Sequence, residues 1–190
     1  VLSGEASTDP KNASIDPLRA LTVARRSAVK AQQGAWRQIG ALLINAPGDL
    51  RDRYRNLSET QVVAAIAHVR PDRMNDAAAA DTMFALRSLA RRYLALNEEI
   101  RSLEDRMRAR ATATNPALMA IKGVGPVIGA QLLITAGDNP DRLRSSASFA
   151  ALCGTAPIPG SSGRTDRHRL SRGGDRQANA ALHHIAKVRM

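Results

Sequence analysis

IKGVGPVIGAQLL, residues 121–133, predicts the end of one helix, a tight turn and the start of a second helix. Gly123 and Gly125 give the turn a backbone that can bend sharply and be approached closely. Pro126 suits the first position of the second helix, because the N–H group that proline lacks would have no helical partner there. Apolar residues then recur at helical spacing. We therefore predict two helices joined by this turn.

The same turn is suited to bind an anion. It would direct unpaired backbone N–H groups outward at a helix N-terminus, where a phosphate group binds well. The pattern resembles the helix-hairpin-helix module, and this resemblance implies binding of nucleic-acid backbone without reading of its sequence. The contacts would come from Lys122, Gly123 and Gly125. An ordinary corner between two helices is the alternative; the turn alone does not separate the two, and the basic charge around it favours phosphate.

Composition indicates a helical, strongly basic chain. Its 190 residues allow one domain or two small ones. Hydrophobic residues make up 44% but aromatic residues only 3%, which is typical of helices packed through small side chains. The net charge of +11 favours a polyanionic partner such as nucleic acid. Arg far outnumbers Lys, so part of this excess is also consistent with a GC-rich genome.

The sequence excludes several other classes of protein. One cysteine, Cys153, excludes an internal disulfide and a cysteine-based zinc cluster. No apolar run reaches the length of a membrane span, and no signal peptide opens the sequence. The cytoplasm is therefore the expected location. Because the sequence begins at Val1 and ends at Met190 within a predicted helix, we also expect a fragment of a longer protein.

The expected fold class is all-α, with a linker at residues 1–16 and a helical coiled-coil region for assembly at 17–111. Helices are predicted at 18–44, from the capping-box sequence at Ser58 to Val69, and at 76–111; residues 49–57 would be a charged connection. The longest helix carries a heptad seam of Leu86, Leu89, Tyr93, Leu96, Ile100, Leu103 and Met107. An intramolecular bundle and pairing with a second subunit would bury the same seam.

Residues 112–190 form the predicted C-terminal domain, and its centre is a loop with serines. Glycines and prolines at 154–163 exclude a regular element, between helices expected at 143–152 and from about 175. Ser161 and Ser162 are candidate nucleophiles, because nearby arginines would lower the serine pKa and stabilise a pentavalent phosphate. A plain flexible turn is the alternative, and spacing alone favours it. Candidate nucleic-acid contacts follow the loop: Arg164, Arg167, His168, Arg169, Arg172 and Arg176.

No metal site is predicted, since the histidines have no acidic partners at ligand spacing. His168 is interpreted as a phosphate contact, and no cofactor is expected in this chain. The order of the motifs resembles the insertion-sequence 110/116/902 transposases. The matching segments are LTVARRSAVKA at 21–31, IKGVGP at 121–126, FAALCGTAP at 149–157, SSG at 161–163 and RHRLSRGGDRQAN at 167–179.

This resemblance implies a division of labour between two domains. In that family an N-terminal RuvC-like domain with a DEDD set of acids binds Mg²⁺, a C-terminal domain supplies a serine, and a bridge RNA guides the cutting and rejoining of DNA. The position of the family's serine corresponds to Ser161, with Ser162 as second choice. The sequence lacks the DEDD domain, so Mg²⁺ is expected only together with that domain.

Two further interpretations stay open. The resemblance implies three partners: DNA, a guide RNA and a second copy of the chain, which would bind through the helical coiled-coil region at 17–111 (the helical arm). It implies no membrane, and it implies a bacterial cytoplasmic protein that is associated with the nucleoid when bound to DNA. Without the DEDD acids, it stays open whether this chain is an enzyme. The alternative function is a non-catalytic helical module that binds DNA or RNA or dimerises.

Overall fold

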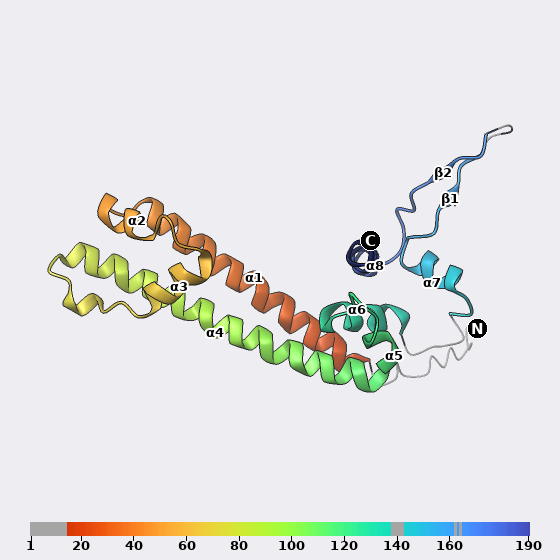
Figure 1. Cartoon of the computed structure of the whole chain (residues 1–190), viewed down its shortest axis with the longest axis horizontal. Helices are drawn as coiled ribbons and strands as arrows, with labels where there is room; N and C mark the ends of the chain where they lie inside the picture. The colour runs from red at the N-terminus through yellow and green to blue at the C-terminus, as the bar shows by residue number, and fades with distance from the viewer. Residues whose placement is uncertain (1–14, 138–142, 162, 164) are drawn as a thin grey trace, which may run out of the picture. The chain divides into compact units, whose positions relative to one another are not determined.

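The computed structural model describes residues 15–137, 143–161, 163 and 165–190. They are mostly helical, which confirms the all-α class (Figure 1). The elements are α1 (Asp16–Ile44), α2 (Gly48–Tyr54), α3 (Glu59–Ala67), the 3₁₀ turn η1 (Pro71–Arg73), α4 (Ala77–Thr114), α5 (Pro116–Met119), α6 (Pro126–Ala136), α7 (Ser146–Leu152), β1 (Ile158–Pro159), β2 (His168–Arg169) and α8 (Arg176–Arg189). No helix in the described ranges has both the length and the apolar character needed to cross a bilayer.

Two local predictions were wrong. The expected charged connection at 49–57 contains α2, because Leu50 and Tyr54 lie one turn apart on the same face and both are buried. The glycine- and proline-rich loop contains the short strand β1, which pairs with β2. Neither segment has the length or periodicity that marks an element from sequence alone.

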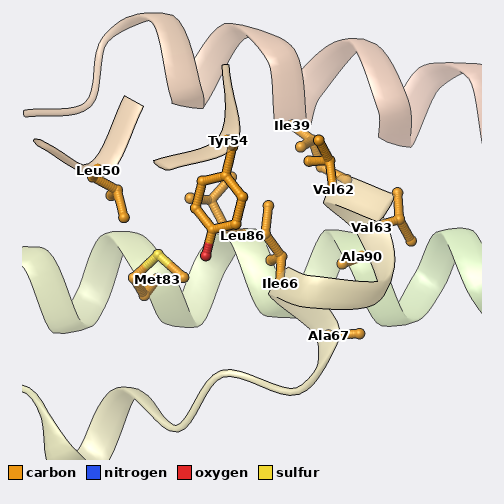
Figure 2. Close-up of a cluster of buried hydrophobic side chains, with 10 residues drawn as sticks. All are labelled: Ile39, Leu50, Tyr54, Val62, Val63, Ile66, Ala67, Met83, Leu86 and Ala90. Carbon is orange, nitrogen blue, oxygen red and sulfur yellow. The ribbon is translucent and has the colours of Figure 1, made fainter. Parts of the chain in front are cut away.

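The chain divides into two compact units, of which Ala24–Leu103 is one. Its core joins side chains of α1, α2, α3 and α4; Figure 2 shows Met83 and Leu86 of α4 pointing toward Tyr54 and Ile66. The predicted capping box begins α3, where the Ser58 N–H donates to the Gln61 side chain at 2.9 Å.

Several side chains of the predicted heptad seam pack against other parts of the same chain. Leu86 and Met107 are fully buried, and Ile100 is nearly so. Leu89 and Tyr93 are half-buried and pack against the core of Figure 2. The side chains at these seam positions are therefore buried within the chain itself. Coiled-coil pairing of the helical arm and self-association stay predictions.

The other unit joins the described residues up to Val23 with those from Glu104 onward. Its α6 is apolar on opposite sides and packs into two clusters. Ala130 and Leu133 join Leu18, Met107 and Ala111 in one cluster. Leu132 joins Cys153, Ala178 and Ala181 in the other, which places α7 and α8 next to α6. The predicted domain limits 1–16, 17–111 and 112–190 stay predictions.

Candidate functional site

The turn between α5 and α6 has the predicted order of elements. Asn115 caps α5 by accepting a hydrogen bond from the Leu118 N–H at 2.9 Å. Gly123 has a φ of +92°, a conformation that glycine adopts without steric cost. Pro126 is the first residue of α6, which confirms its predicted position. Whether this turn acts as a helix-hairpin-helix module stays a prediction.

The two glycines of the turn face different surroundings. A Cβ atom at Gly123 would lie 3.4 Å from the Val188 side chain and 3.5 Å from Ile185 Cα, so this glycine packs against α8. A Cβ atom at Gly125 would have no neighbour within 4 Å, and Lys122 is exposed. The space on the Cβ side of Gly123 is therefore occupied by α8, whereas that of Gly125 is open, and the role of these residues in binding stays a prediction.

A close backbone crossing joins the end of α7 to the start of α8. We call Gly154, Gly173 and Gly174 the glycine crossing. A Cβ atom at Gly154 would overlap the Gly173 carbonyl oxygen. A Cβ atom at Gly174 would lie 2.5 Å from the Gly154 nitrogen and 2.7 Å from the Leu152 carbonyl oxygen. Only glycine fits these positions without moving backbone atoms.

Asp175 holds the crossing to α6. One carboxylate oxygen caps α8 by accepting from the backbone N–H groups of Gln177 at 2.8 Å and Ala178 at 3.2 Å. The other accepts from the Thr135 hydroxyl at 2.6 Å and the Gln131 amide at 3.2 Å. The Asp175 N–H donates to the Leu152 carbonyl at 2.8 Å. The sequence indicated a helix start here, but not the bonds to α6.

Cys153 lies fully buried beside this network. Burial raises the pKa of the Cys153 thiol, and the charge of Asp175 raises it further. A buried thiol with a raised pKa is a poor nucleophile at neutral pH, which agrees with its interpretation as a packed small residue.

The predicted serine loop is the tip of a hairpin formed by β1 and β2, which Figure 1 shows extending beyond α7 and α8. The strands pair Ile158 with Arg169 and Pro159 with His168. The Gly160 N–H then donates to the Arg167 carbonyl at 2.7 Å. Ser161 is exposed at the end of this ladder.

Two neighbours contact the Ser161 hydroxyl. It donates to a carboxylate oxygen of Asp166 at 3.2 Å, and it accepts from the Arg167 N–H at 3.3 Å. The sequence analysis did not single out Asp166, because its place opposite Ser161 depends on the strand register. Ser162, the second candidate nucleophile, lies outside the described residues.

The predicted cations are exposed along the hairpin and the start of α8. His168 and Arg169 form β2, and Arg167 precedes it. The Arg169 side chain lies over Gly160, where a Cβ atom would be 3.1 Å from its Cγ. Arg164 lies outside the described residues.

Arg172 and Arg176 come together around a hollow of about 480 Å³. Its lining also includes Cys153, Ser171, Gly173 and Asn179. Asn179 donates to the carbonyl oxygens of Cys153 at 3.2 Å and Gly154 at 3.3 Å. The hollow thus lies beside Gly173 of the glycine crossing, and two arginines are among its lining residues. Arginine side chains of this kind can bind phosphate oxygens.

The described part of the chain contains no group of three or more His, Cys, Asp or Glu side chains that could hold a metal ion. The family resemblance implies Mg²⁺ together with a RuvC-like domain and not at these residues.

Comparison with known proteins gives one family and two relatives. Residues 115–190 match the model of the Transposase IS116/IS110/IS902 family. The chain is 31% identical over 91 residues to the mini-circle putative transposase for IS117 of Streptomyces coelicolor, covering 48% of this chain and 22% of that protein. It is 37% identical over 99 residues to the insertion element IS110 uncharacterized 43.6 kDa protein of the same organism, covering 50% and 24%. No solved structure matches.

Proposed function

We propose that this chain, which belongs through residues 115–190 to the Transposase IS116/IS110/IS902 family, contributes DNA binding and the Ser161 nucleophile to a transposition reaction. The observation that carries the proposal is the exposed Ser161 hydroxyl at the tip of a hairpin lined by arginines. The chain spans about a quarter of the length of the two relatives, so the proposal concerns one part of a composite site.

The proposed chemistry is attack by the serine oxygen on a DNA phosphodiester. A bond forms between the Ser161 Oγ and phosphorus, and the bond from phosphorus to one deoxyribose oxygen breaks. The serine gives up its proton, and the leaving oxygen takes a proton from solvent water. Because the covalent phosphodiester to serine retains the ester, a second DNA hydroxyl can later reverse the step and join a new strand. Arg167 and Arg169 would stabilise the charge of the pentavalent phosphate.

DNA binding would involve two further places in the same unit. The hollow at Arg172 and Arg176 suits a backbone phosphate, which two guanidinium groups can bind in a forked geometry. The exposed Lys122 and the open backbone at Gly125 would hold another phosphate. Contacts of this kind give affinity without sequence information.

Other partners follow from the family resemblance. We propose that the DEDD acids and their Mg²⁺ lie in a RuvC-like domain outside this chain, and that a bridge RNA selects the DNA. Ser162 stays the second candidate for the nucleophile. His168 of β2 would contact the backbone beside it.

Self-association through the helical arm is also proposed, and one feature favours it. Phe84 is 59% exposed at the edge of a largely apolar groove of about 620 Å³. The groove is lined by Gln38, Ala41, Leu42, Phe84, Ala85, Ser88 and Leu89. Exposed apolar patches of this kind commonly mark protein interfaces. Phe84→Glu should lower the molar mass measured by light scattering; an unchanged mass would contradict this role.

A trapped covalent adduct tests the nucleophile. The chain is combined with a separately supplied RuvC-like domain, guide RNA and target DNA, and a serine–DNA adduct is sought by denaturing electrophoresis and mass spectrometry. The adduct should disappear in Ser161→Ala and persist in Ser102→Ala, which removes an exposed hydroxyl on α4. An adduct that survives Ser161→Ala transfers the role to Ser162.

Salt-dependent DNA binding separates the two functions. The double change Arg172→Ala and Arg176→Ala should weaken binding and flatten its salt dependence, since two phosphate contacts are lost. Arg92→Ala, an exposed cation on α4, is the control. Binding that depends on Arg172 and Arg176 without any adduct would favour the alternative, a non-catalytic nucleic-acid-binding module.

A further inference from the structure

We propose that Asp166 is the general base that removes the proton from the Ser161 hydroxyl. The inference rests on the proposed role of Ser161 as nucleophile. It assigns a catalytic role to an acidic residue in a hairpin whose other charged groups are mostly cationic.

The hydrogen bonds fix where the serine proton points. A serine hydroxyl has one proton and two lone pairs, and an ionised carboxylate can only accept. The bond of 3.2 Å from Ser161 Oγ to Asp166 therefore directs the proton at the carboxylate. One lone pair accepts from the Arg167 N–H at 3.3 Å. The remaining lone pair is available to an incoming phosphorus atom, because Ser161 is exposed.

The strand register explains why these two side chains meet. Pro159 pairs with His168, and the Gly160 N–H donates to the Arg167 carbonyl at 2.7 Å. The next opposed pair in the same antiparallel register is Ser161 with Asp166. Directly opposed residues hold their Cβ atoms close enough for side-chain contact. The strand register of the hairpin thus places Ser161 opposite Asp166.

The distance also suits a base that acts only once substrate is bound. Donor–acceptor distances between hydroxyl and carboxylate oxygens are normally shorter than the 3.2 Å found here. Catalytic hydrogen bonds are often long in the free protein and shorten when the substrate is in place. The Arg167 N–H would then stabilise the developing charge on the serine oxygen as its proton leaves.

Each proton that moves in this step has a donor and an acceptor. As the bond between Ser161 Oγ and phosphorus forms, the proton moves from Oγ to Asp166. The deoxyribose oxygen that leaves phosphorus takes a proton from solvent water, and Asp166 later returns its own proton to solvent. No oxidant, reductant or further reactant is needed.

The test uses a reagent that reports on serine reactivity without DNA. A dialkyl fluorophosphate reacts with an activated serine. A bond from Oγ to phosphorus forms, fluoride leaves, and the serine proton goes to the base. Labelling rates are measured by mass spectrometry, with fragmentation to separate Ser161 from Ser162. Ser161 should react about 100-fold faster than the exposed Ser102, as expected for general-base assistance.

Two changes at Asp166 separate a base from a structural hydrogen bond. Asp166→Asn keeps an oxygen that accepts the serine hydrogen bond but removes the basic carboxylate, so labelling should fall about 100-fold. The labelling rate of Asp166→Ala should fall by the same factor. Added formate should restore part of this rate, because it supplies a carboxylate. Asp105→Asn, an exposed acid on α4, should leave labelling unchanged. Circular dichroism verifies that each variant is folded.

The outcomes distinguish this inference from the proposed function. Labelling of Asp166→Asn at the wild-type rate overturns the base, as does a wild-type Ser161 that reacts no faster than Ser102. Fast labelling that needs Asp166, without any serine–DNA adduct, supports the base and contradicts the proposed function. An adduct that forms at the wild-type rate in Asp166→Asn supports the function and overturns the base.

Discussion

Replacing Gly174 by alanine should destabilise the unit that carries the serine hairpin. Gly174 has a φ of +86°, and its Cβ position lies 2.5 Å from the Gly154 nitrogen and 2.8 Å from Gly154 Cα. All the crowded atoms belong to the backbone, so no flexible side chain can move aside. The added methyl group must push the ends of α7 and α8 apart.

The expected magnitude follows from two terms. An alanine in a left-handed conformation costs about 1–2 kcal/mol. Moving the two backbone segments of the glycine crossing apart also weakens the hydrogen bond from the Asp175 N–H to the Leu152 carbonyl, which is 2.8 Å long in the native fold. Such a bond contributes about 0.5–1.5 kcal/mol. Together they predict a loss of about 1.5–3.5 kcal/mol in the free energy of unfolding.

Urea unfolding followed by circular dichroism measures the loss, and hydrogen exchange locates it. Exchange should accelerate in α7 and α8, which the crossing joins, and stay unchanged in α2 and α3. Gly40→Ala is the matched control, because apart from its chain neighbours and the nearby backbone of α1 nothing lies within 4 Å of its Cβ position. It should stabilise by about 0.5–1 kcal/mol. A Gly174→Ala protein as stable as the wild type, or with unchanged exchange in α7 and α8, would refute the reasoning.

Three further changes test other parts of the fold. Burial raises the pKa of Tyr93 from 10.0 to about 12, together with the hydrogen bond and the charge of Glu59. In Glu59→Gln the pKa of Tyr93 should fall but stay above 10.0, since burial remains. A tyrosinate absorbance titration measures this pKa. Because this pKa is raised by folding, the stability it contributes is present below pH 10 and is lost as pH rises through about 12. Asp175→Ala should cost about 1–2 kcal/mol in urea unfolding through the lost cap of α8, and Asp175→Asn clearly less. Leu86→Ala, at a fully buried position, should cost about 2–5 kcal/mol, whereas Leu94→Ala, at a position 41% exposed, should cost much less.

Local chemistry explains the predictions that the structure confirms. Pro126 opens α6, Ser58 and Gln61 form the capping box of α3, and α8 begins directly after Asp175. Each depends on a few adjacent residues, whose backbone preferences and hydrogen bonds are fixed by residue type. Sequence patterns are therefore reliable for helix starts of this kind.

The elements that the sequence analysis missed depend on contacts from elsewhere in the chain. An isolated helix as short as α2 is marginal in water. It forms because Leu50 and Tyr54 are buried against side chains of α1, α3 and α4. The strand at Ile158 likewise exists through its pairing with Arg169.

The sequence by itself determined the helical class, the capping box of α3 and the glycine turn, and its resemblance to a known family selected Ser161 as the candidate nucleophile. Only the tertiary structure decided which groups meet these residues: Asp166 and Arg167 at the Ser161 hydroxyl, and α6 at Asp175. The physical reason is that a helix cap or a turn is set by neighbours along the chain. A hydrogen-bond partner across a hairpin or from another helix is set by register and packing, which residue order alone does not fix.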